Sequence, residues 1–153
     1  MDLAGTHGPE PKLGPVIDFL RLLWAVDHAL QASSRRMESS LGVTGPQRLT
    51  LRIIGRFPGI AAGRVAKILH VHPSTLTGIL QRLESRGLLA RRPDPKDARR
   101  ALFKLTARGR KIDATRTGTV EAGVRRALAR LPGKIAQAQA VLTALAEELN
   151  LAE

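Results

Sequence analysis

The chain has 153 residues, of which 43% are hydrophobic, and it carries 25 Lys and Arg against 13 Asp and Glu, a formal charge of +12. These values fit one basic globular domain and exclude wholesale disorder, while the absence of Cys excludes disulfides and thiolate chemistry. No apolar run approaches the ~20 residues of a membrane span, and the N-terminal segment lacks the basic and apolar parts of a signal peptide, so we expect a soluble, cytoplasmic protein with no membrane partner.

The excess positive charge lies in the middle of the chain. Residues 48–111 hold sixteen Lys and Arg and three acids, whereas the rest of the chain is almost neutral. Such a block is typical of a surface that binds nucleic acid, although a solvated surface, an anionic membrane or an acidic protein would also suit it. Only 3% of the residues are aromatic, and proteins that bind single strands stack bases on aromatic rings, so a duplex is the favoured target.

The N-terminal part of the chain predicts an arm and one long helix. We expect a flexible arm over residues 1–12 and a helix from Pro15 to about Met37. Apolar side chains cover two sides of this helix, which predicts that one side faces its own domain and the other a partner subunit. These side chains are Val16, Ile17, Phe19, Leu20, Leu23, Trp24, Val26 and Leu30.

The next segment predicts a helix-turn-helix unit. Thr44 and Gln47 fit a capping box, which predicts a second helix starting at Thr44. Two further helices, over residues 60–69 and from Pro73 to about Arg86, are joined by a short connection. The outer face of the later helix carries small polar groups and an amide that suit a DNA groove, with an ordinary exposed face as the alternative. We assign DNA contact on this helix to Ser74, Thr75, Thr77, Gly78, Gln81 and Arg82.

A basic β-hairpin is expected directly after this unit. Residues 88–92 and 100–105 can pair as antiparallel strands, and residues 93–99 have the prolines and aspartates of an exposed turn. A hairpin in this place is a wing that could reach phosphates or a minor groove, where Arg is favoured. We assign DNA contact on the wing to Arg91, Arg92, Lys96, Asp97, Arg99 and Arg100.

The C-terminal part predicts a second apolar stripe. One helix is expected from Thr106 to about Arg130, weakened by internal glycines, and Pro132 and Gly133 then break the chain. The last helix carries apolar residues at alternating spacings of three and four. Because apolar stripes occur at both ends of a short chain, a homodimer is favoured over packing within one chain. The stripe consists of Ile135, Ala138, Leu142, Leu145 and Leu149.

Several short runs, taken in order and spacing, match one protein family. They are Leu41-Gly42-Val43-Thr44; Val65-Ala66 with Leu69; Pro73-Ser74-Thr75-Leu76-Thr77 with Leu83-Glu84 and Arg86-Gly87-Leu88; and Asp94-Pro95-Lys96-Asp97-Ala98-Arg99 with Leu105-Thr106 and Gly109. With them, the chain from about Val16 to Leu149 resembles the MarR family of bacterial transcriptional regulators. The resemblance implies a mainly α fold with a small β-hairpin wing, in which a winged helix-turn-helix domain joins N- and C-terminal dimerisation helices.

The same resemblance implies roles for parts of the chain. Residues 13–40 and 107–150 would dimerise, and residues 44–106 would bind DNA. The helix that starts at Pro73 would enter the major groove, while Asp97 braces Arg99 in the minor groove. Two positions depart from the family pattern. Ala98 stands where many members have a further Arg, and Gly78 stands where a longer side chain is common, which reflects either close approach to DNA or simple tolerance.

These observations predict a sequence-specific DNA-binding regulator, a homodimeric repressor on an inverted-repeat operator. The alternative is an architectural protein that binds duplex DNA with little sequence preference. No set of catalytic residues or phosphate-binding loop indicates an enzyme, and no cofactor is expected. His70 and His72 lack the further ligands of a metal site.

Many members of the family bind small phenolic or carboxylate effectors in a crevice between the dimer helices and the DNA-binding lobe. Trp24, Asp27 and His28 could line such a crevice and bind a small organic effector. The alternative is that they are core or interface residues.

Overall fold

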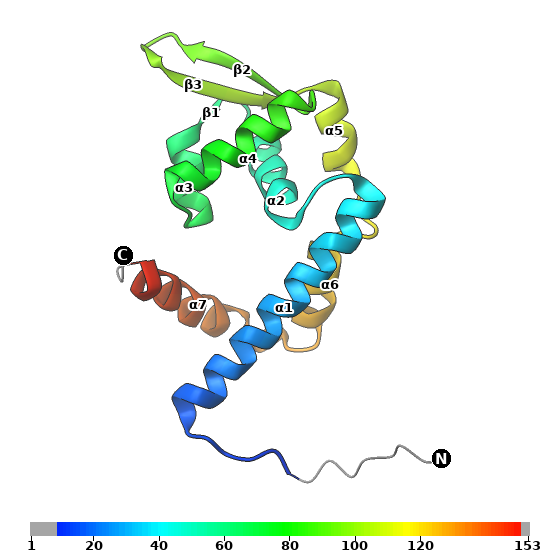
Figure 1. Ribbon diagram of the computed structural model, residues 1–153, viewed down its shortest axis with the longest axis vertical. Helices are drawn as coiled ribbons and strands as arrows, with labels where there is room; N and C mark the ends of the chain where they lie inside the picture. Colours follow the sequence, from blue (N-terminus) through cyan, green and yellow to red (C-terminus); the bar gives the residue numbers. More distant parts are fainter. Residues whose placement is uncertain (1–8, 151–153) are drawn as a thin grey trace.

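The computed structural model describes residues 9–150, and most of the predicted N-terminal arm lies outside the described residues. Seven α-helices and a three-stranded antiparallel sheet make up this part of the chain, which confirms the mainly helical fold with a small wing (Figure 1). The elements are α1 (Pro15–Leu41), α2 (Gly45–Arg56), β1 (Ile60–Ala61), α3 (Ala62–Leu69), α4 (Pro73–Ser85), β2 (Leu89–Asp94), β3 (Asp97–Leu105), α5 (Ala107–Ala114), α6 (Val120–Ala129), the 3-10 turn η1 (Pro132–Lys134) and α7 (Ile135–Asn150).

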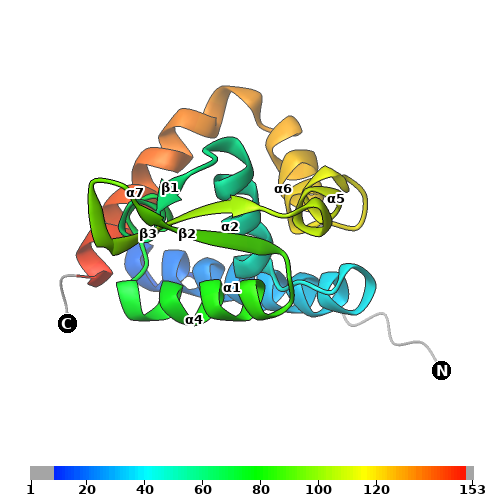
Figure 2. The same ribbon diagram turned by 90° about the horizontal axis from the view of Figure 1, so that it is seen from above.

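One apolar core holds together the elements from α2 to α5, which we call the lobe (residues 44–114). The helices α2, α3 and α4 pack on one another, and the sheet covers their upper end (Figures 1 and 2). Leu51 of α2, Val65 of α3 and Leu76 of α4 point into this core and are buried. The buried apolar side chains of the core are Val43, Leu51, Ile54, Ile60, Val65, Ala66, Leu76, Leu80, Leu83, Leu88, Leu89, Phe103 and Leu105.

The capping box predicted at the start of α2 is present. The Thr44 side chain accepts a hydrogen bond from the backbone N–H of Gln47 at 3.3 Å, and the Gln47 side chain accepts one from the Thr44 N–H at 3.1 Å. Gly45 N–H donates to the Ser34 hydroxyl of α1 at 2.7 Å. This junction therefore fixes how the long first helix meets the lobe.

The sheet begins earlier in the chain than the sequence indicated. Ile60 and Ala61, which were expected to open a helix, instead form β1 and pair with Phe103 and Leu102 of β3. Gly59 turns the chain into this strand with φ +82° and donates its N–H to Phe103 O at 2.8 Å. The prediction was wrong here because the pairing partner lies about forty residues away, beyond the reach of a local pattern.

The wing is longer than expected, and its turn is tighter. Strands β2 and β3 extend to Asp94 and Asp97, so only Pro95 and Lys96 connect them, and the predicted turn over 93–99 is wrong. Asp94 Oδ1 accepts a hydrogen bond from Lys96 N–H at 2.9 Å, which stabilises this connection. The strand register shifts between Pro93 and Asp94, so the ladder is irregular near the tip.

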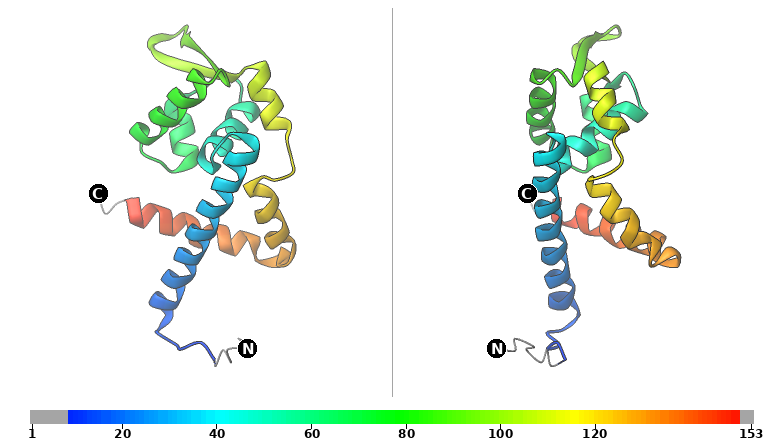
Figure 3. Two further views of the ribbon diagram at one scale, coloured as in Figure 1. Left: turned by 45° about the vertical axis from the view of Figure 1, so that its right-hand side comes forward. Right: turned by 90° about the vertical axis from the view of Figure 1, so that its right-hand side faces the viewer.

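The single helix expected from Thr106 to about Arg130 is two helices, and this prediction was wrong. α5 ends at Ala114, and Thr119 caps α6 by accepting from Ala122 N–H at 3.3 Å. Between them, Gly118 adopts φ +69°, a left-handed conformation that favours glycine. α5 packs against α2 and β3, whereas α6 lies alongside α1 (Figure 3).

One buried arginine explains where this helical break occurs. Arg48 of α2 is 1% exposed, and its guanidinium donates to the backbone carbonyls of Ile112 and Thr115 at the end of α5. It also donates to Glu121 Oε1 of α6, through Nε at 2.9 Å and Nη2 at 2.7 Å. A buried guanidinium is unfavourable without hydrogen-bond acceptors. The end of α5 and the start of α6 provide them, because the helix is broken between these two elements.

The carboxylate of Glu121 is held in its charged form by this contact. Partial burial raises the pKa of Glu121, but hydrogen bonds from Arg48 and from its own backbone N–H, together with the charges of Arg48 and Arg52, outweigh burial. The pKa of Glu121 therefore lies below its ordinary value of 4.5. Arg52 adds a parallel link by donating to Asp113 Oδ1 at 2.8 Å.

Much apolar surface on α1, α6 and α7 remains exposed in the single chain. Val16 is 74% exposed and Trp24 69%, and the stripe predicted on α7 is open at Leu142 and Leu149. In Figure 1, the N-terminal part of α1 extends away from the lobe and α7 lies below the lobe. Within residues 9–150, no helix is long and apolar enough to cross a membrane.

We expect Glu121→Gln to destabilise the chain in a pH-dependent way. The folded pKa of Glu121 is lowered, so its contribution is present above about pH 4.5 and is lost as the pH falls through the folded value. Urea unfolding at pH 7, at one protein concentration, should show a loss of about 1–2 kcal/mol, because Glu121 is partly exposed and Arg48 keeps two carbonyl acceptors. The loss should shrink at pH 3.5.

The matched control is Glu38→Gln on α1, an exposed acid with no ion pair among residues 9–150. It should change the free energy of unfolding little at either pH. An equal loss from both variants, or a Glu121→Gln loss that is the same at both pH values, would contradict the role assigned to this carboxylate.

Candidate nucleic-acid interface

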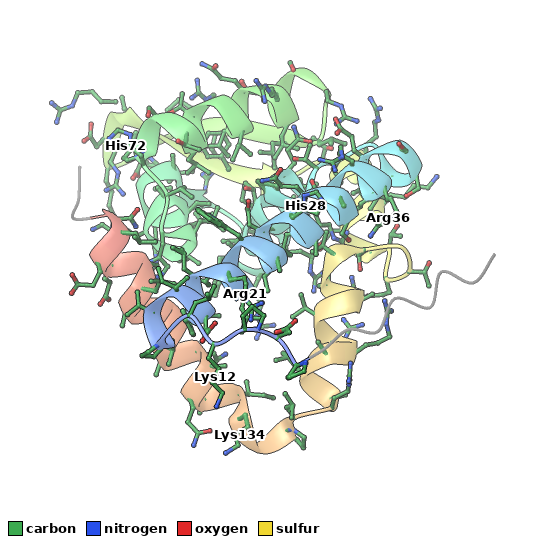
Figure 4. All side chains as sticks on the ribbon, turned by 60° about the horizontal axis from the view of Figure 1, so that its bottom comes forward. Lys12, Arg21, His28, Arg36, His72 and Lys134 are labelled. Carbon is green, nitrogen blue, oxygen red and sulfur yellow. The ribbon has the colours of Figure 1, made fainter. Side chains whose placement is uncertain are left out.

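The helix-turn-helix unit consists of α3, a three-residue connection and α4. His70 ends α3 in a left-handed conformation with φ 53°, and Pro73 occupies the first turn of α4. His72 is the N-cap, and its Nδ1 accepts from Ser74 N–H at 3.1 Å. Figure 4 shows His72 at the start of α4. The pair of histidines that the sequence drew attention to thus has a structural role in shaping the turn.

The outer face of α4 is open to solvent along its length. Buried leucines on the opposite side, Leu76, Leu80 and Leu83, fix the rotation of the helix. All the side chains assigned to DNA contact on this helix are exposed except at Gly78, which is half-buried. A Cβ added at Gly78 would meet nothing within 4 Å, so no contact inside the chain requires glycine there.

The wing places Arg91 beside α4. Arg91 is paired with Phe103 across the hairpin, and its guanidinium carbon lies 5.5 Å from the centre of the Phe103 ring. A small cavity of about 70 Å³ is lined by Arg91 together with Thr77 and Gln81 of α4. The structure therefore brings residues assigned separately to the helix and to the wing into one surface.

Arg92 and Arg100 lie on a different part of the wing. Arg92 is paired with Leu102, so its side chain leaves the opposite side of the sheet from that of Arg91. Arg100 lines a separate groove of about 370 Å³ with Leu102 and with Phe57, Ile60 and Arg64. The six wing residues assigned from the sequence therefore do not form one cluster.

At the tip of the wing, Asp97 holds Arg99. Arg99 Nε and backbone N–H each donate to Asp97 Oδ1 at 3.1 Å, and Nη2 donates to Oδ2 at 3.4 Å. The hydrogen bonds from the Arg99 side chain lower the pKa of Asp97 most, and the bond from the Arg99 backbone N–H lowers it further. The charge of Arg100 has a smaller effect in the same direction. The Arg99 side chain is 91% exposed. The contact between Asp97 and Arg99 that the family resemblance implies is therefore formed, and it holds the Arg99 guanidinium in solvent.

Sequence reasoning missed the residue that contacts Arg91 from α4. Glu84 Oε2 lies 3.6 Å from Arg91 Nε, and Glu84 lines the same small cavity as Thr77 and Gln81. One signal was available, since Glu84 is the only acid between Arg48 and Asp94. Its partner could not be read from the sequence, because it depends on how the hairpin folds back over α4.

The three candidate effector residues lie on the exposed middle of α1. Trp24 and His28 are exposed, and Asp27 accepts a hydrogen bond from Gln31 one turn away at 2.8 Å. Figure 4 shows His28 on this helix. Neither of the two hollows described above includes these residues. Their assignment to an effector stays a prediction.

Comparison with known proteins agrees with this geometry. The model of the MarR family matches residues 41–100, which run from the end of α1 into the wing. The HTH-type transcriptional repressor Rv2887 of Mycobacterium tuberculosis is 33% identical over 110 residues, which cover 72% of this chain and 79% of that protein. The chain belongs to the MarR family. It is thus a DNA-binding transcriptional regulator and not an enzyme.

Solved structures share the fold of this MarR-family chain. The transcriptional regulator SlyA superposes with a TM-score of 0.74 at 23% identity, covering 89% of this chain and 99% of that one. A mutant of E. coli MarR complexed with operator DNA superposes with a TM-score of 0.70 at 27% identity, covering 85% and 94% of the two chains. The winged helix-turn-helix architecture is therefore confirmed.

The Gly78→Ala variant tests why glycine stands at this position. Either α4 approaches DNA closely there, or glycine is simply tolerated. Alanine there should raise the free energy of unfolding by about 0.5–1 kcal/mol, because it is the better helix former and meets no neighbour. If α4 approaches a base pair closely at Gly78, the same variant should bind duplex DNA less tightly despite its greater stability. The measurements are urea unfolding and fluorescence anisotropy with labelled duplex.

Gly109→Ala is the contrasting variant. A Cβ at Gly109 would lie 2.1 Å from the backbone oxygen of Leu88, so α5 or the start of the wing must move. We expect a loss of more than about 1 kcal/mol, the ordinary effect of a strained substitution. Equal stability of the two variants would contradict the packing described here.

Proposed function

We propose that this MarR-family chain is a homodimeric repressor that reads an inverted-repeat operator. α4 would lie in the major groove, and the wing would reach the flanking minor groove. The single observation that carries this proposal is the continuous surface formed by Thr77 and Gln81 of α4 with Arg91 of the wing. The repressor role is supported by the similarity to Rv2887.

The dimer is supported by the exposed apolar side chains at both ends of the chain. Residues 13–40 and 107–150 would supply the dimer helices, although α5 packs with the lobe, and residues 44–106 would bind DNA. Large apolar patches exposed on one chain are typical of association surfaces. In this arrangement, Val16, Trp24 and Leu142, all about half exposed or more in the single chain, would be covered by the partner.

Two-fold symmetry sets the form of the operator. Two recognition helices related by a dyad would contact half-sites about one helical turn, ~10 bp, apart. A small organic ligand that binds between the dimer helices and the lobe would release DNA by changing that spacing. The residues proposed to contact it are Trp24, Asp27 and His28.

A second candidate function is architectural binding with little sequence preference. The short side chains of Ser74, Thr75 and Thr77 and the absence of a side chain at Gly78 favour it, since they offer few bidentate contacts to bases. A specific regulator should prefer its site over random duplex by well above ~10³ at physiological salt. An architectural protein should not.

Substitutions at Gln81 of α4 and at Arg99 of the wing should change DNA binding in different ways. Gln81→Ala should relax discrimination at one half-site position, by about 1–3 kcal/mol for the preferred base when the amide pairs bidentately with adenine. Arg99→Ala should weaken binding to most sequences and make the slope of log K against log salt shallower by up to about one unit, because one phosphate contact is lost. Asp97→Ala should act like a milder Arg99→Ala.

The experiment titrates these variants against the best duplex selected from a random library and against a scrambled duplex, at several salt concentrations. An Arg99→Ala variant with unchanged affinity and unchanged salt slope would mean that the wing does not touch DNA. A Gln81→Ala variant that loses affinity equally for all bases would remove Gln81 from base reading.

Truncation after Pro132 tests the dimer. Removal of α7 deletes one of the two apolar stripes. The shortened chain should aggregate or unfold, since the exposed apolar face of α1 would then lack the partner helix proposed to cover it. Sedimentation and circular dichroism report the outcome. A soluble, folded monomer from this truncation would contradict the dimer proposal.

A further inference from the structure

The carboxylate of Glu84 lies inside the surface proposed to read DNA. Glu84 is in the last turn of α4, and its side chain lines the cavity between that helix and the wing. Within residues 48–111 the other two acids are Asp94 and Asp97, both near the wing tip. Asp94 stabilises the tip connection and Asp97 holds Arg99, so each has a local partner.

Glu84 has a poorer partner. Its Oε2 is shielded from solvent and accepts no hydrogen bond among the described residues, 9–150. The nearest cation is Arg91, whose Nε lies 3.6 Å away, a distance at which the charges attract but no hydrogen bond forms. The Glu84 side chain as a whole remains 38% exposed. For the shielded Oε2, the attraction of Arg91 offsets part of the cost of lacking a hydrogen bond.

Arg91 is held from two sides in the free protein. Glu84 attracts its guanidinium from α4, and the buried Phe103 ring lies under it at 5.5 Å. Arg91 remains 58% exposed, so a DNA phosphate could still reach it. A phosphate that drew Arg91 away would leave the shielded Oε2 of Glu84 without its nearby cation and close to another negative charge, which adds an energetic cost to that contact.

This cost falls unequally on different DNA sequences. Binding to non-cognate duplex depends almost wholly on phosphate contacts, so an arginine that is withheld weakens it directly. Binding to a cognate site also has base contacts from α4, and these can form while Arg91 stays over Phe103. We propose that Glu84 is a specificity-determining residue that withholds the Arg91 guanidinium from non-cognate duplex DNA. The inference rests on the proposed function, in which α4 and the wing contact DNA together.

A simpler effect must be separated from this one. Any acid near DNA repels phosphates, so its removal tightens binding whatever its neighbours are. Withholding predicts something more specific, namely that the effect of Glu84 requires Arg91. Asp94→Asn is the matched control, because Asp94 is an acid in the same basic surface whose hydrogen bond goes to the Lys96 backbone and not to an arginine side chain.

The experiment is a double-mutant cycle on the full chain. Glu84→Gln, Arg91→Ala and the double variant are titrated by fluorescence anisotropy, each at several salt concentrations. The probes are a 30 bp random-sequence duplex and the duplex that the wild-type protein selects from a random library. Asp94→Asn is measured alone and with Arg91→Ala, and melting curves confirm that every variant is folded.

We expect Glu84→Gln to tighten binding to the random duplex by roughly three- to tenfold and to steepen its salt slope by up to ~0.9, the contribution of one more phosphate contact. The gain on the selected duplex should be less than about twofold, so the specificity ratio falls. With Arg91→Ala in place, Glu84→Gln should keep only the effect of removing one repelling acid, no larger than that of Asp94→Asn on the same duplex. Asp94→Asn should act equally in both backgrounds.

Three results would overturn the inference. An equal gain from Glu84→Gln with and without Arg91 would show simple repulsion. An equal gain on both duplexes would show that Glu84 does not set specificity. Weaker binding to both duplexes would show that Glu84 helps to hold Arg91 for contact instead of withholding it.

Failure of the proposed function gives a different pattern. In that case the wild-type protein would select no preferred duplex at all. The cycle on the random duplex would still report whether Glu84 acts through Arg91.

Discussion

The guanidinium of Arg48 is the contact on which the arrangement of this molecule depends. It is buried in α2, yet its acceptors among residues 9–150 lie at the α5–α6 junction: two backbone carbonyls and the Glu121 carboxylate. α5 belongs with the lobe and α6 lies along α1, so this side chain joins the Gly45–Ser34 junction in connecting the lobe to the helices proposed to dimerise. α2 shares its apolar core with α4, the helix proposed to read DNA, so the Arg48 contact also bears on where α4 lies. The distance between two recognition helices in a dimer would depend on it.

The same contact shows why a charge count from sequence overstates the DNA-binding surface. Arg48 belongs to the basic block of residues 48–111, but it is buried, and Arg52 is paired with Asp113. Arg91 is attracted by Glu84, and Arg86 donates to the Gly42 carbonyl. Several of the arginines that make the segment basic therefore have partners inside the chain. The arginine at the wing tip, Arg99, stands out because its acid partner holds it in solvent.

Local signals were reliable in this sequence, and distant pairings were not. The capping box of Thr44, the proline that begins α4 and the polar outer face of that helix all predicted what the structure shows. The β1 strand and the break after Ala114 were not predicted, because each depends on a partner far away in the chain. The wing turn was predicted too wide, although its hydrogen bond from Lys96 N–H to Asp94 is local. In the candidate site, the Asp97–Arg99 brace followed from a motif. The Glu84–Arg91 contact required the fold.

The central claim is that two copies of α4 and the wing contact one duplex around a two-fold axis. Hydroxyl-radical footprinting on a duplex selected by the full chain tests it most directly. The account predicts protected segments related by a dyad, with half-site centres ~10 bp apart and further protection in the flanking minor grooves. A single asymmetric protected segment, or even protection along the whole duplex, would contradict it.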